Sequence, residues 1–574
     1  MSVTFNILNT DVQLEILEVL QAISPQSLLN VSLCCKNLHD LARSPIYRVI
    51  SILFTRKRRD TNGRLIQRLL MDTDLSTKVR EIRILWAPSA NLQHGEGRKK
   101  DLELLGKVLP KLTGLKTFVW DAQYPILEWL LHSLYANAPH CQLYTRVPAR
   151  KDLVRTLSNL HDSPCLYSLD IALSPGDVNA FLRLREAVAT SERLKDLSVI
   201  WERGSHSLTW HRSLELLSTP LQLRSLELDG PMDFPGIEKP WQLSVAWPTL
   251  ERFSCTNISF LPNLASQLTG LTSLRLRVGD DEDRGALWTF LHEQCHQLSV
   301  LDLTGCTAAI NRNGAEIWKH LGKTLISLRI HEDEIPSAFR ERPTLSPLQL
   351  GILATTCQRL RSLGLDLECP YRPTLLTSEK IPREYQMLDQ VADNFWFLEH
   401  LEFNVEIDIA DQGQFTYARA TMVGAGQLWN YLWQQIRSSR VRKWHKISLP
   451  RLRSLDVVGG SYRPVSDMGS FLDRSSHWEA AAQQRFHINL SERDDKAMKG
   501  IATVTCVELR ALQAKLGSRE PFRNRQQKVL MDAVTKRART GPFVRQVPPV
   551  LMDREMMRAS PFWDRLDERR FYYR

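Results

Sequence analysis

The chain has 574 residues, a formal net charge of +11 at pH 7 and 43% hydrophobic residues, an ordinary composition for a globular protein. No apolar run reaches the roughly 18 residues that a membrane helix needs, and the first residues lack a charged stretch before an apolar core, so we expect neither a membrane span nor a secretory signal. Ten cysteines without framework spacing indicate reduced thiols and a cytoplasmic or nuclear location.

The first 50 residues predict a separate unit of three short helices. Thr10 and Gln13 fit a capping box at the start of the first helix. Ser24 followed by Pro25 fits an N-cap with proline in the first turn of the second helix, and a third follows around Leu41. Helices this short bury little area, and their leucines outnumber the positions of one internal core. Part of this apolar surface is therefore expected to face a partner.

Residues 5–50 contain three groups of residues: Leu8-x-x-Asp11-x-x-Leu14-Glu15-Ile16-Leu17-x-x-Leu20, then Pro25-x-x-Leu28-Leu29-x-Val31, then Cys35-Lys36 and Leu41-Ala42. In this order and spacing they resemble an F-box. Three departures mark a divergent, fungal-type version of the motif. Asn9 replaces a proline, Leu38 stands where tryptophan is frequent, and Tyr47 replaces a later tryptophan.

The resemblance implies that these helices bind a Skp-type adaptor and, through it, a cullin scaffold. The residues expected at the adaptor contact are Leu8, Ile16, Leu17, Leu20, Pro25, Leu28 and Leu29. Neither a catalytic residue nor a cofactor nor a metal is implied, because such a receptor contributes only proximity.

Residues 51–78 are expected to form a linker with one helix near Leu65 and Leu69. The linker carries a basic cluster, Arg56 to Arg59. This cluster is interpreted either as a solvated connection or as a nuclear-import or phosphate-binding patch.

A short apolar motif recurs from residue 79 to residue 462, with three apolar residues at i, i+3 and i+5. The triples begin at Val79, Leu115, Leu166, Leu194, Leu223, Leu250, Leu271, Leu298, Leu325, Leu360, Leu398 and Leu452. The last two residues of a triple lie on one face of a short strand, and stacked units share a core. The longer interval after Leu115 leaves room for a further strand around Cys141 to Tyr144. The spacing predicts an α/β solenoid of strand-turn-helix repeats around a curved parallel sheet.

The repeats extend the resemblance to F-box/leucine-rich-repeat proteins, which are substrate receptors of Skp–cullin–F-box ubiquitin ligases. Cys295 and Cys357, each three residues before a triple, are typical of the cysteine-containing class of leucine-rich repeat. The residue between the last two anchors, with its neighbours, faces the inner wall. The wall residues expected to include contacts to a protein substrate are Asp170, Glu227, Arg275, Arg277, Asp302, Arg329, Asp366 and Glu402. The alternatives are solvated strand positions, or contacts made by loops and the C-terminal tail.

Three further segments follow or interrupt the repeats. Residues 404–447 form an expected insertion whose tryptophans lie on a packing helix or on a protruding binding element. Residues 463–518 are expected to form a helical cap, and residues 519–574 a basic, mobile tail. Neither a membrane nor nucleic acid is an expected partner, because the basic residues of the tail alternate with acidic ones.

One motif suggests catalysis. His292-Glu293-Gln294-Cys295-His296 matches the H-E-x-x-H pattern of zinc proteases. The expected strand begins two residues after His296 and no third ligand is evident, so we expect exposed histidines at a helix end. Three interpretations stay open: a substrate receptor, a protein-interaction scaffold outside any ligase, and a hydrolase at this motif.

Overall fold

The computed structural model describes much of the chain between residues 8 and 506. The described ranges are 8–23, 25–54, 59–86, 96–121, 126–147, 153–173, 178–201, 220–229, 244–256, 264–278, 284–293, 295–332, 343–370, 383–395, 397–406, 452–459, 484–490 and 502–506. The chain divides into two compact units: residues 1–230 with 234–246 form unit 1, and residues 231–233 with 247–574 form unit 2.

Unit 1 begins with the three predicted helices, α1 (Thr10–Ile23), α2 (Pro25–Ser32) and α3 (Lys36–Arg48). Leu17, Leu28 and Ala42, one from each helix, are fully buried and form the core of this bundle. The start of α1 lies one residue earlier than predicted, because Asn9 rather than Thr10 is its N-cap. The Asn9 Oδ1 accepts a hydrogen bond from the Asp11 N–H at 3.3 Å, and the Gln13 side chain donates to the Leu8 carbonyl instead of closing a capping box.

The expectation of a linker over residues 51–78 is wrong. Helix α3 is followed directly by strand β1 (Val49–Phe54), and then by α4 (Arg59–Met71) and α5 (Thr73–Lys78). Strand β1 pairs in parallel with β2 (Glu81–Trp86) along its whole length, and its side chains Ile50 and Ile52 are buried. The predicted helix near Leu65 is α4, whereas Arg56 to Arg58 of the basic cluster lie outside the described residues.

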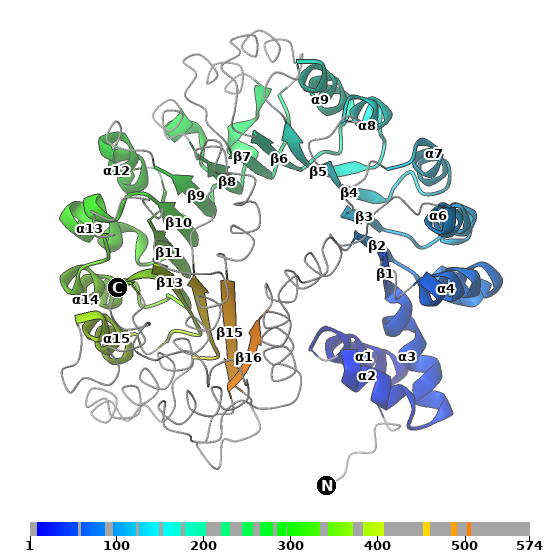
Figure 1. Cartoon of the computed structure of the whole chain (residues 1–574), viewed down its shortest axis with the longest axis horizontal. Coiled ribbons are helices and arrows are strands. Elements are labelled where there is room, and N and C mark those ends of the chain that lie inside the picture. The colour runs from blue at the N-terminus through cyan, green and yellow to red at the C-terminus, as the bar shows by residue number, and fades with distance from the viewer. Residues whose placement is uncertain are drawn as a thin grey trace, which may run out of the picture. The chain divides into compact units, whose positions relative to one another are not determined.

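The rest of unit 1 alternates strands and helices. Its further elements are α6 (Glu96–Val108), the 3-10 helix η3 (Leu109–Lys111), β3 (Thr117–Asp121), α7 (Glu128–Asn137), β4 (Gln142–Val147), α8 (Leu153–Leu160), β5 (Leu166–Leu173), α9 (Val178–Thr190), β6 (Asp196–Trp201) and β7 (Ser225–Asp229). Strands β1 to β7 are all parallel, and each pairs with its neighbours in sequence. The helices lie along one face of this sheet (Figure 1). Strand β4 is the further strand expected around Cys141.

Unit 2 continues the same pattern. Its elements are η5 (Trp247–Thr249), β8 (Arg252–Cys255), η7 (Ala265–Gln267), β9 (Ser273–Arg277), α12 (Arg284–Glu293), β10 (Val300–Thr304), α13 (Thr307–Leu321), β11 (Ser327–His331), α14 (Pro347–Thr356), β12 (Ser362–Pro370), α15 (Arg383–Asn394), β13 (His400–Glu406) and β14 (Ser454–Gly459). Strands β8 to β14 are parallel and pair in sequence order. In both units this open arrangement is consistent with a solenoid.

The strands at the predicted triples are confirmed. Every described side chain of the twelve triples is buried, and equivalent anchors pair across strands, so that Leu301 is in register with Leu274 and Leu328. Each repeat therefore adds a layer to a continuous apolar core. Complete burial of one such leucine stabilises the fold by about 1.5–3 kcal/mol.

The expectation of helices across residues 463–518 is wrong for two described segments. Strand β15 (Gln484–Leu490) pairs antiparallel with β14, and β16 (Ala502–Cys506) pairs antiparallel with β15. Apolar residues alternate in β15, at Phe486, Ile488 and Leu490, and β16 contains β-branched residues, a composition typical of strands. Among the described residues no helix is long and apolar enough to cross a bilayer.

Candidate functional site

Helices α1 and α2 expose apolar side chains that the bundle core does not use. Val12, Ile16 and Val19 are 42%, 40% and 53% exposed, and their spacing of four and three residues places them on one face of α1. Leu29 and Leu33 are 43% and 81% exposed on α2 and in the turn that follows it. We call these five residues the exposed apolar set. Apolar surface left in water on a small helical bundle is typical of a protein-binding site.

The residues predicted at an adaptor contact separate into two groups. Ile16 and Leu29 belong to the exposed apolar set, while Leu8 and Leu20 are half-buried. Leu17 and Leu28 are 1% and 0% exposed and pack in the bundle core. Pro25 begins α2, and its side chain lies outside the described residues.

Three residues of the exposed apolar set are not among the predicted contacts: Val12, Val19 and Leu33. The helical spacing of Val12, Ile16 and Val19 was a usable signal. The sequence could not distinguish this exposed face from the buried leucines of α1. Apolar residues occur on nearly every side of that helix, and the sequence does not show which side packs inward.

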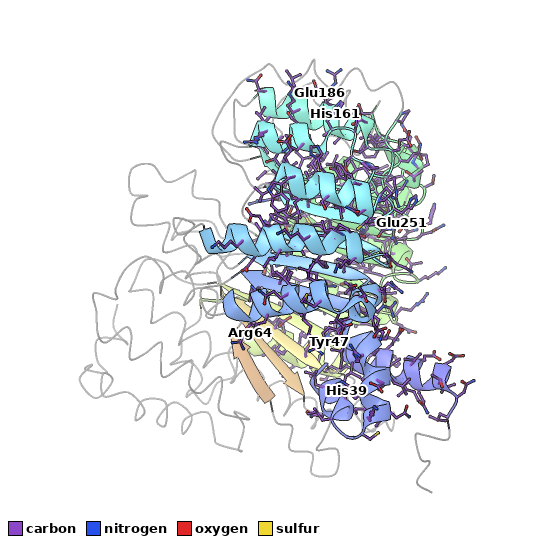
Figure 2. All side chains as sticks on the ribbon, turned by 90° about the vertical axis from the view of Figure 1, so that its right-hand side faces the viewer. His39, Tyr47, Arg64, His161, Glu186 and Glu251 are labelled. Atoms are coloured by element: carbon purple, nitrogen blue, oxygen red, sulfur yellow. The ribbon has the colours of Figure 1, made fainter. Side chains whose placement is uncertain are left out.

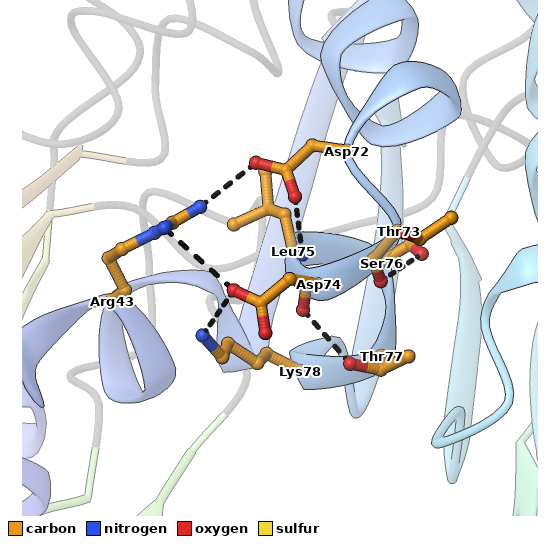
Figure 3. A network of polar contacts seen from close by, with 8 residues as sticks. All are labelled: Arg43, Asp72, Thr73, Asp74, Leu75, Ser76, Thr77 and Lys78. Carbon is orange, nitrogen blue, oxygen red and sulfur yellow. Dashed lines mark hydrogen bonds and ion pairs between the residues drawn. The ribbon is translucent and has the colours of Figure 1, made fainter. Parts of the chain in front are cut away.

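Ion pairs fix the bundle to the sheet of unit 1. The Arg43 guanidinium on α3 contacts the Asp72 carboxylate at 2.9 Å and the Asp74 carboxylate at 3.8 Å (Figure 3). Asp72 is also the N-cap of α5 and accepts the Leu75 N–H at 2.9 Å. This backbone hydrogen bond, together with the charge of Arg43, holds the pKa of Asp72 below its ordinary value. Its carboxylate therefore stays charged at neutral pH and keeps its contact with α3.

Two further contacts stabilise the bundle, one within it and one to helix α4. The Arg48 guanidinium pairs with Glu18 at 2.5 Å and so connects α3 to α1. The Arg68 guanidinium of α4 lies 5.7 Å from the centroid of the Tyr47 ring, a cation–π distance. Figure 2 shows Tyr47 on α3 close to the helix that carries Arg64. The exposed apolar set is therefore presented by a bundle that packs directly on the first strand and helices of the sheet.

The charged wall residues of unit 2 contact one another across neighbouring strands. Asp302 is in register with Arg275 on one side and with Arg329 on the other. Its carboxylate lies 3.4 Å from the Arg275 Nε and 3.5 Å from the Arg329 Nη1. Arg329 also reaches Glu402, with 2.7 Å between Nε and Oε1. We call Arg275, Asp302, Arg329 and Glu402 the charge ladder.

Arg329 reaches Glu402 by crossing an intervening strand. Gly364 of β12 stands between them in register, and a Cβ at that position would lie 2.8 Å from the Arg329 Cγ. Burial alone would lower the pKa of Arg329, but Glu402 and Asp302 together raise it above its ordinary value. The guanidinium is therefore held charged between two carboxylates, and the ladder balances its own charge.

The remaining wall residues are partly engaged as well. In unit 2, the His331 Nδ1 lies 2.9 Å from the Asp366 Oδ1, and Arg277 is the last residue of β9. In unit 1, Asp170 pairs with the Arg146 Nε at 3.2 Å, and Glu227 accepts the Ser198 hydroxyl at 3.0 Å. The sequence placed these residues on the correct face of the strands but did not indicate their pairing.

The H-E-x-x-H motif lacks the geometry of a zinc protease. Helix α12 ends at Glu293, so His296 does not share a helix face with His292. Both rings lie near His320 of α13, with centroids 5.4 Å and 5.0 Å from it. Across the ranges that the structure describes, no three His, Cys, Asp or Glu side chains are grouped so that they could hold a metal ion. The expected insertion beyond residue 406 and the basic tail lie outside those ranges.

The comparisons with known proteins agree with the bundle. The family model of the F-box domain matches residues 6–49, which comprise helices α1 to α3 and end at the first residue of β1. No protein of curated function matches the chain. An F-box domain binds a Skp-type adaptor and thereby a cullin, and proteins that carry one are typically non-catalytic adaptors of ubiquitin ligases.

Proposed function

We propose that this chain is the substrate-recognition subunit of a cullin-type ubiquitin ligase. Its F-box helices bind the Skp-type adaptor, and its parallel sheet, a leucine-rich-repeat solenoid, holds a target protein for ubiquitin transfer. The chain itself performs no chemistry and acts by bringing the target close to the transfer machinery. The proposal includes a cytoplasmic or nuclear location.

The observation that carries the proposal is the exposed apolar set on a bundle that matches the F-box model. A helix keeps residues such as Val12, Ile16 and Val19 in water only at a cost that a partner removes. Burying one such side chain contributes roughly 1.5–3 kcal/mol. Because Val12, Ile16 and Val19 are 40–53% exposed, burying their remaining surface contributes roughly 2–4 kcal/mol together. The cost of association is roughly 4–15 kcal/mol, so these residues supply part of the binding free energy and the rest of the interface supplies the remainder.

The leucine-rich-repeat assignment is supported by the recurring triples and by Cys295 and Cys357, which are buried three residues before their triples. These thiols have raised pKa values because burial opposes the charged form, to about 12 for Cys295 and about 11 for Cys357. Such thiols pack as small apolar groups and carry no thiolate chemistry at neutral pH.

The alternative is an interaction scaffold that works outside a ligase. Its support in the sequence is Asn9 in place of the F-box proline. Asn9 caps α1 through its own side chain, so the start of the helix keeps a stabilising contact without the proline. This favours the receptor over the scaffold.

Co-purification of a Skp-type adaptor and a cullin with the full chain tests the proposal. The Ile16→Asp/Val19→Asp variant places two charges in the exposed apolar set and should weaken adaptor binding by more than tenfold. The matched control is Met71→Asp/Leu348→Asp, two apolar residues that are 84% and 71% exposed elsewhere, which should bind normally. Binding of neither adaptor nor cullin by the unmodified chain would refute the receptor, and binding of adaptor without cullin would favour the scaffold.

A further inference from the structure

The sheet face of unit 1 that points away from the helices carries a line of carboxylates toward the carboxyl ends of the strands. The residues Asp170, Ser198 and Glu227 are in register on β5, β6 and β7, and Arg146 of β4 continues the line. Asp121 ends β3 and Asp229 ends β7. We call Asp121, Asp170, Glu227 and Asp229 the acidic row. The local negative charge of the acidic row is opposite in sign to the net charge of the whole chain, which is +11.

The acidic row is not neutralised by its neighbours. On the strands of this carboxyl half, Arg146 is the one basic residue within the described ranges, and it already pairs with Asp170 at 3.2 Å. Asp121, Glu227 and Asp229 make no ion pair with any described residue. Burial raises the pKa of Asp170, and the negative charges of Glu227 and Asp121 add to that effect against the opposing charge of Arg146.

The charge ladder of unit 2 is a wall of the same fold that balances its own charge. There, acidic and basic side chains alternate from strand to strand, and Arg329 contacts two carboxylates at once. Cross-strand pairs of opposite charge are stabilising, whereas like charges on neighbouring positions are destabilising. In the acidic row, Arg146 stands between the strands of Asp121 and Asp170, and Ser198 stands between Asp170 and Glu227. One basic residue therefore faces four carboxylates, and the row is complementary to further positive charge.

A pair of tyrosine rings lies on the same sheet, nearer the amino ends of the strands than the acidic row. The Tyr144 and Tyr167 ring centroids are 5.3 Å apart, and Tyr144 is in register with Val119 and Ser168 on the same face. Burial raises the pKa of Tyr144, and Tyr167, Asp196 and Glu81 raise it further against the opposing charge of Arg224, which marks a negative environment around the ring. A guanidinium stacks on a tyrosine face while its N–H groups bind carboxylates, which a lysine ammonium does less well.

We infer that this face of unit 1 binds an extended, arginine- and lysine-rich segment of a partner protein. The inference rests on the proposed function, in which that partner is the target to be ubiquitinated, and it specifies the target's chemical class. From β3 to β7 the acidic row spans four strand spacings, about 19 Å. An extended segment that crosses the strands covers this distance with about six residues. Nucleic acid is repelled by the same charges.

The test uses the full chain bound to its adaptor and fluorescence anisotropy with two labelled 12-residue peptides. One peptide contains arginine at alternate positions and the other contains aspartate. The arginine peptide should bind and the aspartate peptide should not. Affinity should fall steeply as salt is raised from 50 to 300 mM, because the contacts are ionic and exposed. Equal binding of both peptides, or binding of neither, overturns the inference.

A triple variant locates the site on the sheet face. Asp121→Asn/Glu227→Gln/Asp229→Asn should weaken the arginine peptide by about tenfold or more, since each lost ion pair is worth up to about 1 kcal/mol. The matched control removes three exposed carboxylates from helices of the same unit. It combines Glu103→Gln, Glu128→Gln and Glu186→Gln, where Glu186 already pairs with Arg183 and lies on α9 (Figure 2). Equal effects of the two triple variants would mean that the peptide senses only total charge, and would overturn the site.

The tyrosine pair supplies a second, independent variant. Tyr144→Phe should bind the arginine peptide with normal affinity, because the ring is retained. Tyr144→Ala should reduce the affinity for the arginine peptide by a few fold, and should reduce the affinity for a lysine peptide by less. Adaptor binding is measured on every variant. Normal adaptor binding shows that the variant is folded, so loss of peptide then concerns this face alone. Absent adaptor binding by the unmodified chain is instead a failure of the proposed function.

Discussion

Replacing Gly364 with alanine tests whether this glycine exists to let Arg329 cross strand β12. The added Cβ would lie 2.8 Å from the Arg329 Cγ and 3.3 Å from its Cβ. The first separation is too short for a real contact, so the arginine would have to leave its position against Glu402 and Asp302. Hydrogen bonds to charged groups contribute about 1.5–3 kcal/mol. Because the Arg329 side chain is 31% exposed, we discount this and expect a loss of about 1–2 kcal/mol.

The decisive measurement is the same substitution in an Arg329→Ala background. There the Cγ is absent, and alanine in place of glycine restricts the unfolded chain, which favours folding by about 0.4–1 kcal/mol at a compatible position. Gly364→Ala should therefore be neutral or stabilising in that background. Urea denaturation of the four proteins gives a coupling energy that we expect to exceed about 1 kcal/mol. An equal cost of Gly364→Ala in both backgrounds would refute the steric explanation, since the clash would then lie elsewhere.

Three further predictions concern the bundle and the histidine cluster. Leu17→Ala should destabilise unit 1 by about 2–5 kcal/mol in denaturation experiments, because it empties the bundle core, and a smaller cost would place Leu17 at the surface. Asn9→Ala should cost about 1 kcal/mol through the lost N-cap, with Asn9→Ser as the conservative control that retains most of the stability. Burial, with the charges of His296 and His292, lowers the pKa of His320, so the unfolded chain binds this proton more readily. Stability should consequently fall as the pH drops below about 6.5, and His320→Gln should reduce the fall in melting temperature between pH 7.5 and pH 5.5. An unchanged slope would exclude His320 as its source.

The strands could be predicted from the sequence because the apolar residues that each strand buries lie close together in the sequence. Three apolar residues at i, i+3 and i+5 define the strand and its inward face without knowledge of the neighbours. Strand β1 obeys the same rule, with Tyr47, Ile50 and Ile52 at that spacing. It was missed because residues 1–50 were assigned to the helical unit and residues 51–78 to a linker, whereas Tyr47 lies in helix α3 directly before the strand. Strands β15 and β16 were missed because they follow an alternating pattern in place of the repeat motif.

The candidate sites could be predicted only in part. The sequence placed Arg275, Asp302 and Arg329 on one face, but which of them pair depends on strand register and on the reach of a long side chain across Gly364. The adaptor residues show the same limit. Leu17 and Ile16 are adjacent and similarly apolar, and only the packing of α2 and α3 decides that Leu17 is buried while Ile16 is 40% exposed.

The direct passage from α3 into β1 has a consequence for how ubiquitin would reach a target. With no spacer between Arg48 and Val49, a residue inserted at the end of α3 would rotate the helices by about 100° relative to the strand. A residue inserted in β1 would instead turn the inward side chains that follow it outward. Under the proposed function, a target held on unit 1 and an adaptor held on its helices would move together as one rigid body. The target lysines that receive ubiquitin would then be those at one fixed distance from the adaptor-binding helices. In targets of different size, that distance would fall on different lysines.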